Sequence, residues 1–170
     1  MRDPNFAGTV VLLWHYADDG AMGVVINRSM AIAIGEVGRQ LSIEEGDIAM
    51  PELPDRVLWG GPVEPGAGFL LFKGEIPEEE GWNVENKIAV TTSQERLEHL
   101  LRSGGEYRLC LGYAGWAPGQ LDHEIEIGSW LYTDPKAAIV FDEEIDDRYD
   151  LALASLGLLA SEVWMTPIDE

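Results

Sequence analysis

The sequence predicts one α+β domain built around a mixed β-sheet. Its 170 residues are the usual length of one domain, and such a chain buries roughly two thirds of the surface that its unfolded form exposes. The expected strands come in hairpin pairs, and helices interrupt them irregularly instead of following every strand. No repeat or low-complexity linker divides the chain, so residues 1–170 are expected to form a single domain.

The N-terminal third is expected to be mostly β-strand. Residues 8–15 and 21–27 are apolar runs rich in β-branched side chains, and the turn sequence Ala17–Gly20 between them predicts a buried hairpin. Apolar residues at helical spacing predict a short helix over Ala33–Leu41. Residues 44–55 contain prolines and several acids and are expected to form an exposed loop.

The middle of the chain is expected to alternate strands with turns. Arg56–Trp59 and Gly68–Lys73 have the composition of strands, and a glycine-rich turn over residues 60–67 joins them. Residues 75–86 are acidic and are expected to be irregular. The alternation of Lys87–Thr91 then predicts another strand.

The clearest helix signal follows this strand. Thr92 and Glu95 have the spacing of a capping box, leucines form an apolar stripe behind them, and Gly104 is typical of a helix end. The alternation of Tyr107–Tyr113 predicts the next strand.

The C-terminal third is expected to contain two helices and a second hairpin. A helix over residues 120–127 is expected to take Pro118 as its first residue. Residues 129–133 and 137–141 are expected to be strands on either side of an Asp-Pro turn, and residues 146–156 to form the last helix.

Charge restricts the partners of this protein. The chain carries 11 Lys and Arg against 31 Asp and Glu, a formal net charge of −20. Such a surface repels polyanions, so direct binding to nucleic acid or to an anionic membrane is not expected. A single cysteine, Cys110, and a sequence without a transmembrane run or signal peptide favour the cytoplasm.

The residue types that carry most catalysis form no recognisable constellation. His15, His99 and His123 lie in different expected elements and lack the spacing of a zinc site, so no metal or other cofactor is expected. Cys110 shares a strand face with Arg108, whose charge could lower the thiol pKa, but a buried structural cysteine is the commoner case. An enzyme is therefore the less favoured interpretation.

The tract Gly112–Leu121 is the best candidate for a ligand site. It joins a strand end to a helix N-terminus around Gly119 and Gln120, whose free N–H groups could accept an anion. A structural alternative stays open, because small residues beside Trp116 could let two segments cross while the tryptophan fills the core.

Two other turns have the same character, and an arginine near them could supply positive charge. The turns lie at Asp3–Phe6 and Gly60–Val63, and the arginine is Arg28. If these segments converge, they form one pocket. The candidate ligand-binding residues lie on these turns and strand ends: Asn5, Arg28, Gly60, Gly61, Tyr113, Trp116, Gly119 and Gln120.

Four motifs occur along the chain in a fixed order: DPNF (3–6), GVVINR (23–28), GGPV (60–63) and GYAGWAPGQL (112–121). Together they resemble the bacterial AlgH/YqgE family, and the resemblance extends over nearly the whole chain. It implies one α+β domain whose mixed sheet is bent toward a pseudo-barrel and flanked by helices. The family name comes from a proposed role in transcriptional regulation of alginate production, and no settled catalytic residues come with it.

The chain departs from the family pattern in two places. Family members usually begin further upstream, with an apolar strand before the segment that matches residues 1–6. Whether the sheet of this chain closes is therefore an open question at this point. They often carry Cys-Glu-His where this chain has Trp14, His15 and Tyr16. No role for a thiol or carboxylate is therefore carried over to that position.

Two functions are compatible with these observations. The preferred one is a binding or regulatory module that acts on transcription indirectly, through an unknown protein partner or a small ligand, without direct contact with DNA. The alternative is an enzyme for a small anionic substrate, a phosphate or a carboxylate, held by Arg28 and the N–H groups near Gly119. A purely structural role for every motif also stays open.

Overall fold

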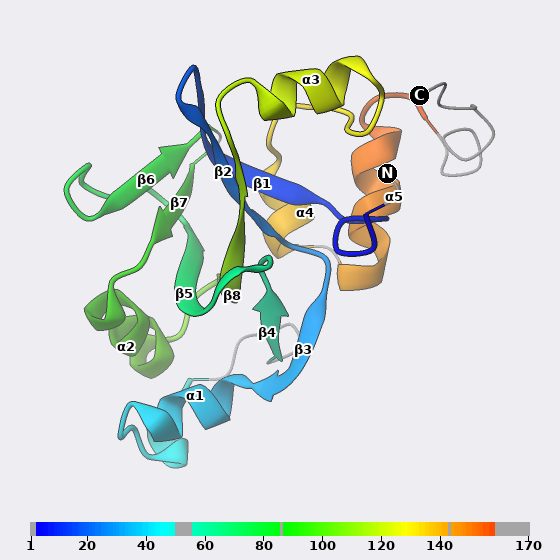
Figure 1. Ribbon diagram of the computed structural model, residues 1–170. Coiled ribbons are helices and arrows are strands. Elements are labelled where there is room, and N and C mark those ends of the chain that lie inside the picture. Colours follow the sequence, from blue (N-terminus) through cyan, green and yellow to red (C-terminus); the bar gives the residue numbers. More distant parts are fainter. Residues whose placement is uncertain (1–2, 50–55, 86, 143, 159–170) are drawn as a thin grey trace.

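The computed structural model describes residues 3–49, 56–85, 87–142 and 144–158 (Figure 1). One eight-stranded sheet runs through these residues, and helices flank it. The strands are β1 (Val11–Ala17), β2 (Gly20–Val25), β3 (Ser29–Ala33), β4 (Arg56–Trp59), β5 (Val63–Lys73), β6 (Gly81–Val84), β7 (Ile88–Thr91) and β8 (Tyr107–Trp116). The helices are α1 (Ile34–Gln40), α2 (Gln94–Ser103), α3 (Gln120–Glu126), α4 (Ala137–Phe141) and α5 (Arg148–Ala154), with 3-10 turns at Glu45–Asp47 and Ile145–Asp147.

The sheet is mixed and nearly closed. Its main path runs in the order β1-β2-β8-β5-β7-β6, while β4 pairs with both β3 and β8. The β4–β8 pairing is parallel and the others are antiparallel. The sheet curls until its end strands, β1 and β6, approach each other. This is the bent pseudo-barrel that the family resemblance implied.

Two apolar clusters pack on opposite faces of the sheet. Because side chains alternate along a strand, Leu71 enters one cluster and its neighbour Leu70 enters the other. The first cluster also contains Val140 and Phe141 of α4, and the second contains Leu101 of α2. Each face of the sheet is thus covered by a helix (Figure 1).

The first predicted hairpin is confirmed, and it carries an irregularity. β1 pairs antiparallel with β2, and the register shifts between Leu13 and His15, which places a bulge at Trp14. Asn27 fixes the start of β1, because its side-chain oxygen accepts a hydrogen bond from the Val10 N–H at 2.8 Å.

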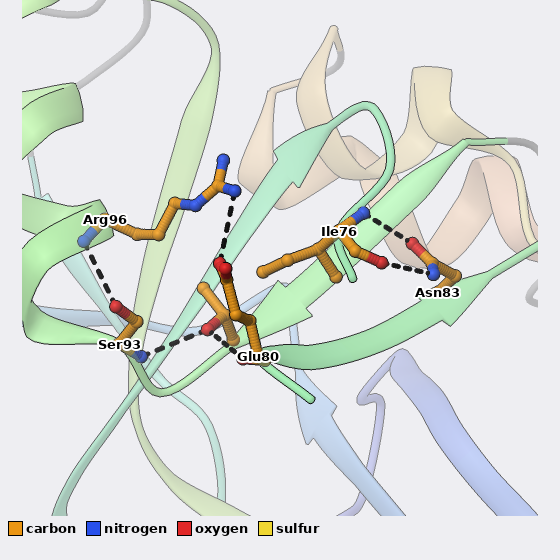
Figure 2. A network of polar contacts seen from close by, with 6 residues as sticks. Ile76, Glu80, Asn83, Ser93 and Arg96 are labelled. Atoms are coloured by element: carbon orange, nitrogen blue, oxygen red, sulfur yellow. Dashed lines mark hydrogen bonds and ion pairs between the residues drawn. The ribbon is translucent and has the colours of Figure 1, made fainter. Parts of the chain in front are cut away.

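Helix α2 is confirmed, but its cap lies one residue later than predicted. The backbone stays extended through Ser93, and the Ser93 hydroxyl, not that of Thr92, accepts a hydrogen bond from the Arg96 N–H at 3.2 Å. Figure 2 shows how the Arg96 guanidinium reaches the Glu80 carboxylate, also at 3.2 Å. The Thr91 hydroxyl donates to the Glu80 main-chain oxygen at 2.7 Å. These contacts tie α2 to the segment that precedes β6.

Strands β3 and β6 were not predicted, and β5 begins at Val63 instead of Gly68. These segments are short or exposed, so they lack the apolar alternation by which strands are recognised. A side chain holds β6 in place: the Asn83 amide makes two hydrogen bonds to main-chain atoms of Ile76, at 2.9 and 2.8 Å (Figure 2).

The second predicted hairpin is wrong. Residues 129–136 form no strand, and residues 137–141 form helix α4. A strand would direct the neighbours Val140 and Phe141 to opposite faces, whereas both are buried in one cluster, which a helical turn allows. The run AAIVF is too short for its periodicity to distinguish a helix from a strand.

The remaining predicted helices are confirmed with shifted ends. α3 begins at Gln120, behind Gly119 with a φ of 76°, so Pro118 lies in the preceding turn and not at the first helical position. The predicted loop over residues 44–55 is described only as far as residue 49. None of the helices in the described ranges combines the length and apolar content needed to cross a bilayer.

Candidate functional site

Arg28 and Asn5, two of the predicted ligand-binding residues, lie side by side. The Arg28 guanidinium donates to the main-chain oxygens of Asn5 at 2.5 Å and Ala7 at 2.9 Å, and it lies over the Trp59 ring, 5.5 Å from its centre. The Asn5 N–H donates to the Asp3 carboxylate at 2.9 Å. Arg28 therefore clamps the N-terminal segment against β4, and its donors bind protein carbonyls.

Gly60 and Gly61 pack against β8 where no side chain would fit. A Cβ atom on Gly60 would lie under 3.0 Å from the Gly112 oxygen, and one on Gly61 would lie equally close to the Tyr113 carbonyl. Gly61 also has a φ of 151°, which L side chains rarely adopt. The Tyr113 ring packs edge-on against Phe69 at 5.5 Å. These residues build a close crossing of two segments, the structural alternative that the sequence left open.

Gly119 and Gln120 form the turn that leads into α3. The Gln120 side-chain oxygen accepts a hydrogen bond from the Ala117 N–H at 2.9 Å. The Gln120 side chain thereby stabilises the turn that it belongs to. Helix α3, which follows this turn, has only seven residues.

Trp116 stands at the end of β8 and is the one predicted residue that lines a large cavity. Its ring packs against Phe6 and Trp130, with centroid distances of 6.2 and 5.8 Å. The structure thus places the eight predicted residues in separate local arrangements, with Trp116 at the cavity. Ligand contact by any of the eight stays a prediction.

The cavity has a volume of about 610 Å³ and lies between β1, residues 128–136 and α5. Every residue from 8 to 16 lines one wall, every residue from 128 to 136 lines the second, and α5 contributes Ala152 and Leu153 to the third. Ligand pockets in proteins are typically roughly 300–1,000 Å³ and mostly apolar, so this cavity has the size and lining of a binding site.

Two indole N–H groups in the cavity wall have no hydrogen-bond acceptor among the described residues. They belong to Trp14 and Trp130, and both nitrogens are buried. Trp14 is only 8% exposed; its ring stacks on Phe69 at 5.0 Å and lies tilted against Trp82 at 5.4 Å. Buried tryptophan N–H groups are usually paired, so these two nitrogens are unusual among the buried polar atoms of the described chain.

The rim of the cavity exposes large apolar side chains. Tyr16, Leu131, Tyr132 and Leu156 line the cavity and are 40, 50, 57 and 39% exposed. The Tyr16 and Tyr132 rings meet edge to face at 6.1 Å, and the Tyr16 hydroxyl donates to the Asp122 carboxylate. That hydrogen bond raises the pKa of Tyr16 to about 12. An exposed apolar rim around an apolar cavity is typical of an interaction site.

The chain also matches a known protein family. The family described as AlgH-like (DUF179) matches residues 1–161. The chain belongs to this family. The AlgH-like chain is 41% identical to a UPF0301 protein of Paracoccus denitrificans, with 93% of this chain and 85% of that protein covered. It is 35% identical to a UPF0301 protein of Vibrio atlanticus, with 96% and 89% covered.

Solved structures have the same fold as the AlgH-like chain. The solution structure of the AlgH protein from Pseudomonas aeruginosa superimposes with a TM-score of 0.75 at 34% identity, covering 100% of this chain and 90% of that one. A crystal structure of a Corynebacterium diphtheriae protein gives a TM-score of 0.71 at 20% identity, covering 90% and 80%. The second likeness concerns the fold alone. A nearly closed mixed sheet with flanking helices is therefore the fold of the AlgH-like chain.

The cysteine of the AlgH-like chain is buried away from the cavity. Burial raises the pKa of Cys110 to about 12, and this effect exceeds the opposite influence of Arg148 and Arg108. Both arginines are themselves buried: Arg108 donates to the Phe141 oxygen at 2.5 Å, and Arg148 donates to the Ile26 oxygen. The thiol is protonated and enclosed, in agreement with the structural interpretation of this residue.

Histidines and carboxylates of the AlgH-like chain do not assemble a metal centre in the part that the structure describes, where no three such ligands come together. His15 contacts Asp19 at 2.6 Å on the surface, four residues along the chain. His99 and His123 are exposed.

The motifs of the AlgH-like chain indicated little of the cavity wall. Trp14 and Trp130 come from opposite ends of the sequence, and only the fold brings them to one cavity. One signal was present: Trp130, Leu131 and Tyr132 are three consecutive large apolar residues in a segment that forms no strand or helix. Such a run has no element in which to bury itself, which favours a role in lining a site.

Proposed function

We propose that the AlgH-like chain is a binding module and that it holds an apolar ligand or partner in the cavity between β1, residues 128–136 and α5. The observation that carries the proposal is the cavity of about 610 Å³ with its exposed apolar rim. Any effect on transcription is then indirect and is exerted through the bound partner, because a net charge of −20 opposes direct contact with DNA.

The energetics favour an apolar ligand. Apolar contact with the cavity walls contributes about 25 cal/mol for each Å² removed from water. This contribution acts only when the cavity is filled.

An enzyme for a small anionic substrate has weaker support. The cation proposed for it, Arg28, already binds the main-chain oxygens of Asn5 and Ala7. In the described lining of the cavity, Lys136 is accompanied by two acids, Glu85 and Asp134. Such a lining does not favour a phosphate or carboxylate.

Binding can be tested with N-phenyl-1-naphthylamine, an uncharged apolar probe that fluoresces when it leaves water. We expect saturable binding to the intact protein. Ala152 lines the cavity from α5, so Ala152→Phe should fill it and weaken binding by at least about tenfold, which corresponds to about 1.4 kcal/mol.

The matched control is Ala154→Phe, the same substitution on the same helix at an exposed position outside the cavity wall. It should bind the probe as the wild type does. Equal binding by both variants, or no saturable binding by the wild type, would contradict the proposed function.

A further inference from the structure

Helix α3 borders the cavity and is flanked by a glycine at each end. Leu121 and Ile125 of α3 line the cavity beside Trp116. Gly119 precedes the helix with a φ of 76°, and Gly128 follows it with a φ of 79°. A Cβ atom on either glycine would meet nothing within 4 Å, so close packing is not the reason for a glycine there. Both positions have the backbone freedom that a hinge needs.

Apolar packing holds α3 less firmly than it holds α5, although both helices have seven residues. In α3 only Leu121 is buried, and Ile125 is partly buried. In α5 both Arg148 and Leu153 are buried, and the Arg148 guanidinium donates to the Ile26 oxygen. α3 also lies at the upper end of the molecule in Figure 1. We therefore expect α3 to detach from the sheet at a lower free-energy cost than α5.

Two carboxylates attach α3 to the ends of neighbouring strands. Asp122 accepts a hydrogen bond from the Tyr16 hydroxyl of β1. Glu124 faces Trp116 of β8, whose indole N–H acts on it as a hydrogen-bond donor. The second oxygen of Glu124 is buried and has no hydrogen-bond partner in the described chain. A charged carboxylate in this position gives up hydration that the closed arrangement does not replace.

The surroundings of Glu124 oppose its negative charge. Burial raises the pKa of this carboxyl above 4.5, and the hydrogen bond from Trp116 acts in the opposite direction. Of the charged groups near it, Asp3 in the N-terminal segment raises the pKa and His123 on α3 lowers it. Protonation therefore stabilises the closed arrangement. This stabilisation is complete below pH 4.5 and is lost as the pH rises through the pKa of the closed state.

We infer that α3 is a lid over the Trp116 end of the cavity, hinged at Gly119 and Gly128 and loosened by the negative charge of Glu124. This inference rests on the proposed function and names the regulation of that site. When α3 swings outward, its apolar side chains leave the cavity wall and a ligand can enter. The ionised Glu124 favours the open lid, and the protonated side chain favours the closed one.

Thiol labelling measures opening of the lid without any ligand. Leu121 on α3 and Leu153 on α5 are both 5% exposed and both line the cavity, so Leu121→Cys and Leu153→Cys are matched reporters. The natural thiol, Cys110, is buried and protonated and adds only a slow background. Relative to the rates in guanidinium, dithionitrobenzoate should label Leu121→Cys at least about tenfold faster than Leu153→Cys. Equal rates would mean that α3 opens only with the rest of the protein, and the inference would be wrong.

The same reporter tests the charge of Glu124. In the Leu121→Cys protein, Glu124→Gln should slow labelling by at least about threefold, because the amide resembles the protonated carboxyl. Glu126→Gln is the matched control, since it removes an equal charge from an exposed position of the same helix. It should leave the rate within about twofold of the parent. Equal rates in the two variants would overturn the inference.

Amide hydrogen exchange repeats the test with natural residues. The Ile127 N–H donates to the His123 oxygen at the end of α3, and the Ser155 N–H donates to the Leu151 oxygen at the end of α5, both at 3.1 Å. The protection factor of Ile127 should be at least about tenfold lower. It should rise as the pH is lowered from about 7.5 to about 5.5 in the wild type but not in Glu124→Gln. A rise of the same size in both proteins would contradict the role of Glu124.

Association of N-phenyl-1-naphthylamine links the lid to the cavity. Stopped-flow fluorescence should show association at least about threefold slower in Glu124→Gln than in Glu126→Gln. Saturable binding of the probe at the same rate in both variants would overturn the lid and leave the proposed function intact. Fast labelling of Leu121→Cys without any binding of the probe would instead contradict the proposed function, while the opening motion of α3 would stand.

Discussion

The crossing of β4 with β8 and the outer edge of β1 belong to one sheet, yet their backbones are paired very differently. At the crossing, Gly60 donates to the Leu111 oxygen at 2.8 Å and accepts from Val25 at 2.8 Å. At the edge, β1 pairs only with β2 among the described strands. The glycine motifs thus mark the place where the sheet is packed most tightly, whereas the candidate site lies where strand pairing stops.

The largest expected contrast concerns Cys110, which lies in the tightly packed region. The pKa of Cys110 is about 12, against 9.0 for a free thiol. At pH 8 its thiolate fraction is therefore about one thousandth of that of a free thiol. Dithionitrobenzoate should therefore label the native protein at least about a thousandfold more slowly than the protein in guanidinium. Similar rates in the two conditions would show that the crossing opens readily and would remove the contrast with the edge.

Substitution of Gly61 should give the largest loss of stability. Gly61→Ala places a Cβ atom against the Tyr113 carbonyl at a φ of 151° and should lower the free energy of unfolding by about 3 kcal/mol or more. Gly66→Ala is the control, because a Cβ atom there meets nothing within 4 Å and should change stability by less than about 0.5 kcal/mol. Guanidinium unfolding followed by tryptophan fluorescence measures both, and equal effects would contradict the tight crossing.

A smaller effect is expected for Arg28. Arg28→Ala removes hydrogen bonds to the Asn5 and Ala7 oxygens and the contact with the Trp59 ring, at a cost of about 1–2 kcal/mol. Arg39→Ala, an exposed arginine on α1, should be nearly neutral in the same unfolding experiment. A thermal shift with inorganic phosphate that is lost in Arg28→Ala would instead support an anion site.

The smallest effect is expected at the rim, where the Tyr16 hydroxyl donates to Asp122. The folded-state pKa of Tyr16 is raised from 10.0 to about 12, so its stabilisation is complete below pH 10 and is lost as the pH rises toward 12. Because Tyr16 is 40% exposed, Tyr16→Phe should cost only about 0.5 kcal/mol at pH 7. The difference from wild type in urea unfolding should vanish at high pH, and a constant difference would exclude this hydrogen bond as its cause.

The sequence predicted the elements whose signals are local. The β-branched runs of the first hairpin and the capping spacing before α2 each lie within a few residues, and both elements are present. α4 was mistaken for a strand because five apolar residues carry no distinguishable period, and its helical form is set by burying Val140 and Phe141 together. β6 was missed because Asn83 holds it through contacts with Ile76, which composition does not reveal.

The candidate site was far less predictable than the fold. Its walls depend on which strand ends the sheet and on how residues 128–136 return past it, and both are decided by tertiary packing. Trp116 was predicted through its motif, whereas Trp14 lay in an ordinary apolar strand. Glycines that allow close approach look alike in sequence whether a ligand or another segment is the neighbour, and at Gly60 and Gly61 the neighbour is β8.

At high protein concentration, an open strand edge tends to pair with the same edge of another copy. The bulge at Trp14 breaks the regular spacing of this edge, and Asp18 and Asp19 follow at its end. With a net charge of −20, two copies also repel each other before their edges can meet. The irregular strand and the surrounding acids together discourage fibre-like self-assembly.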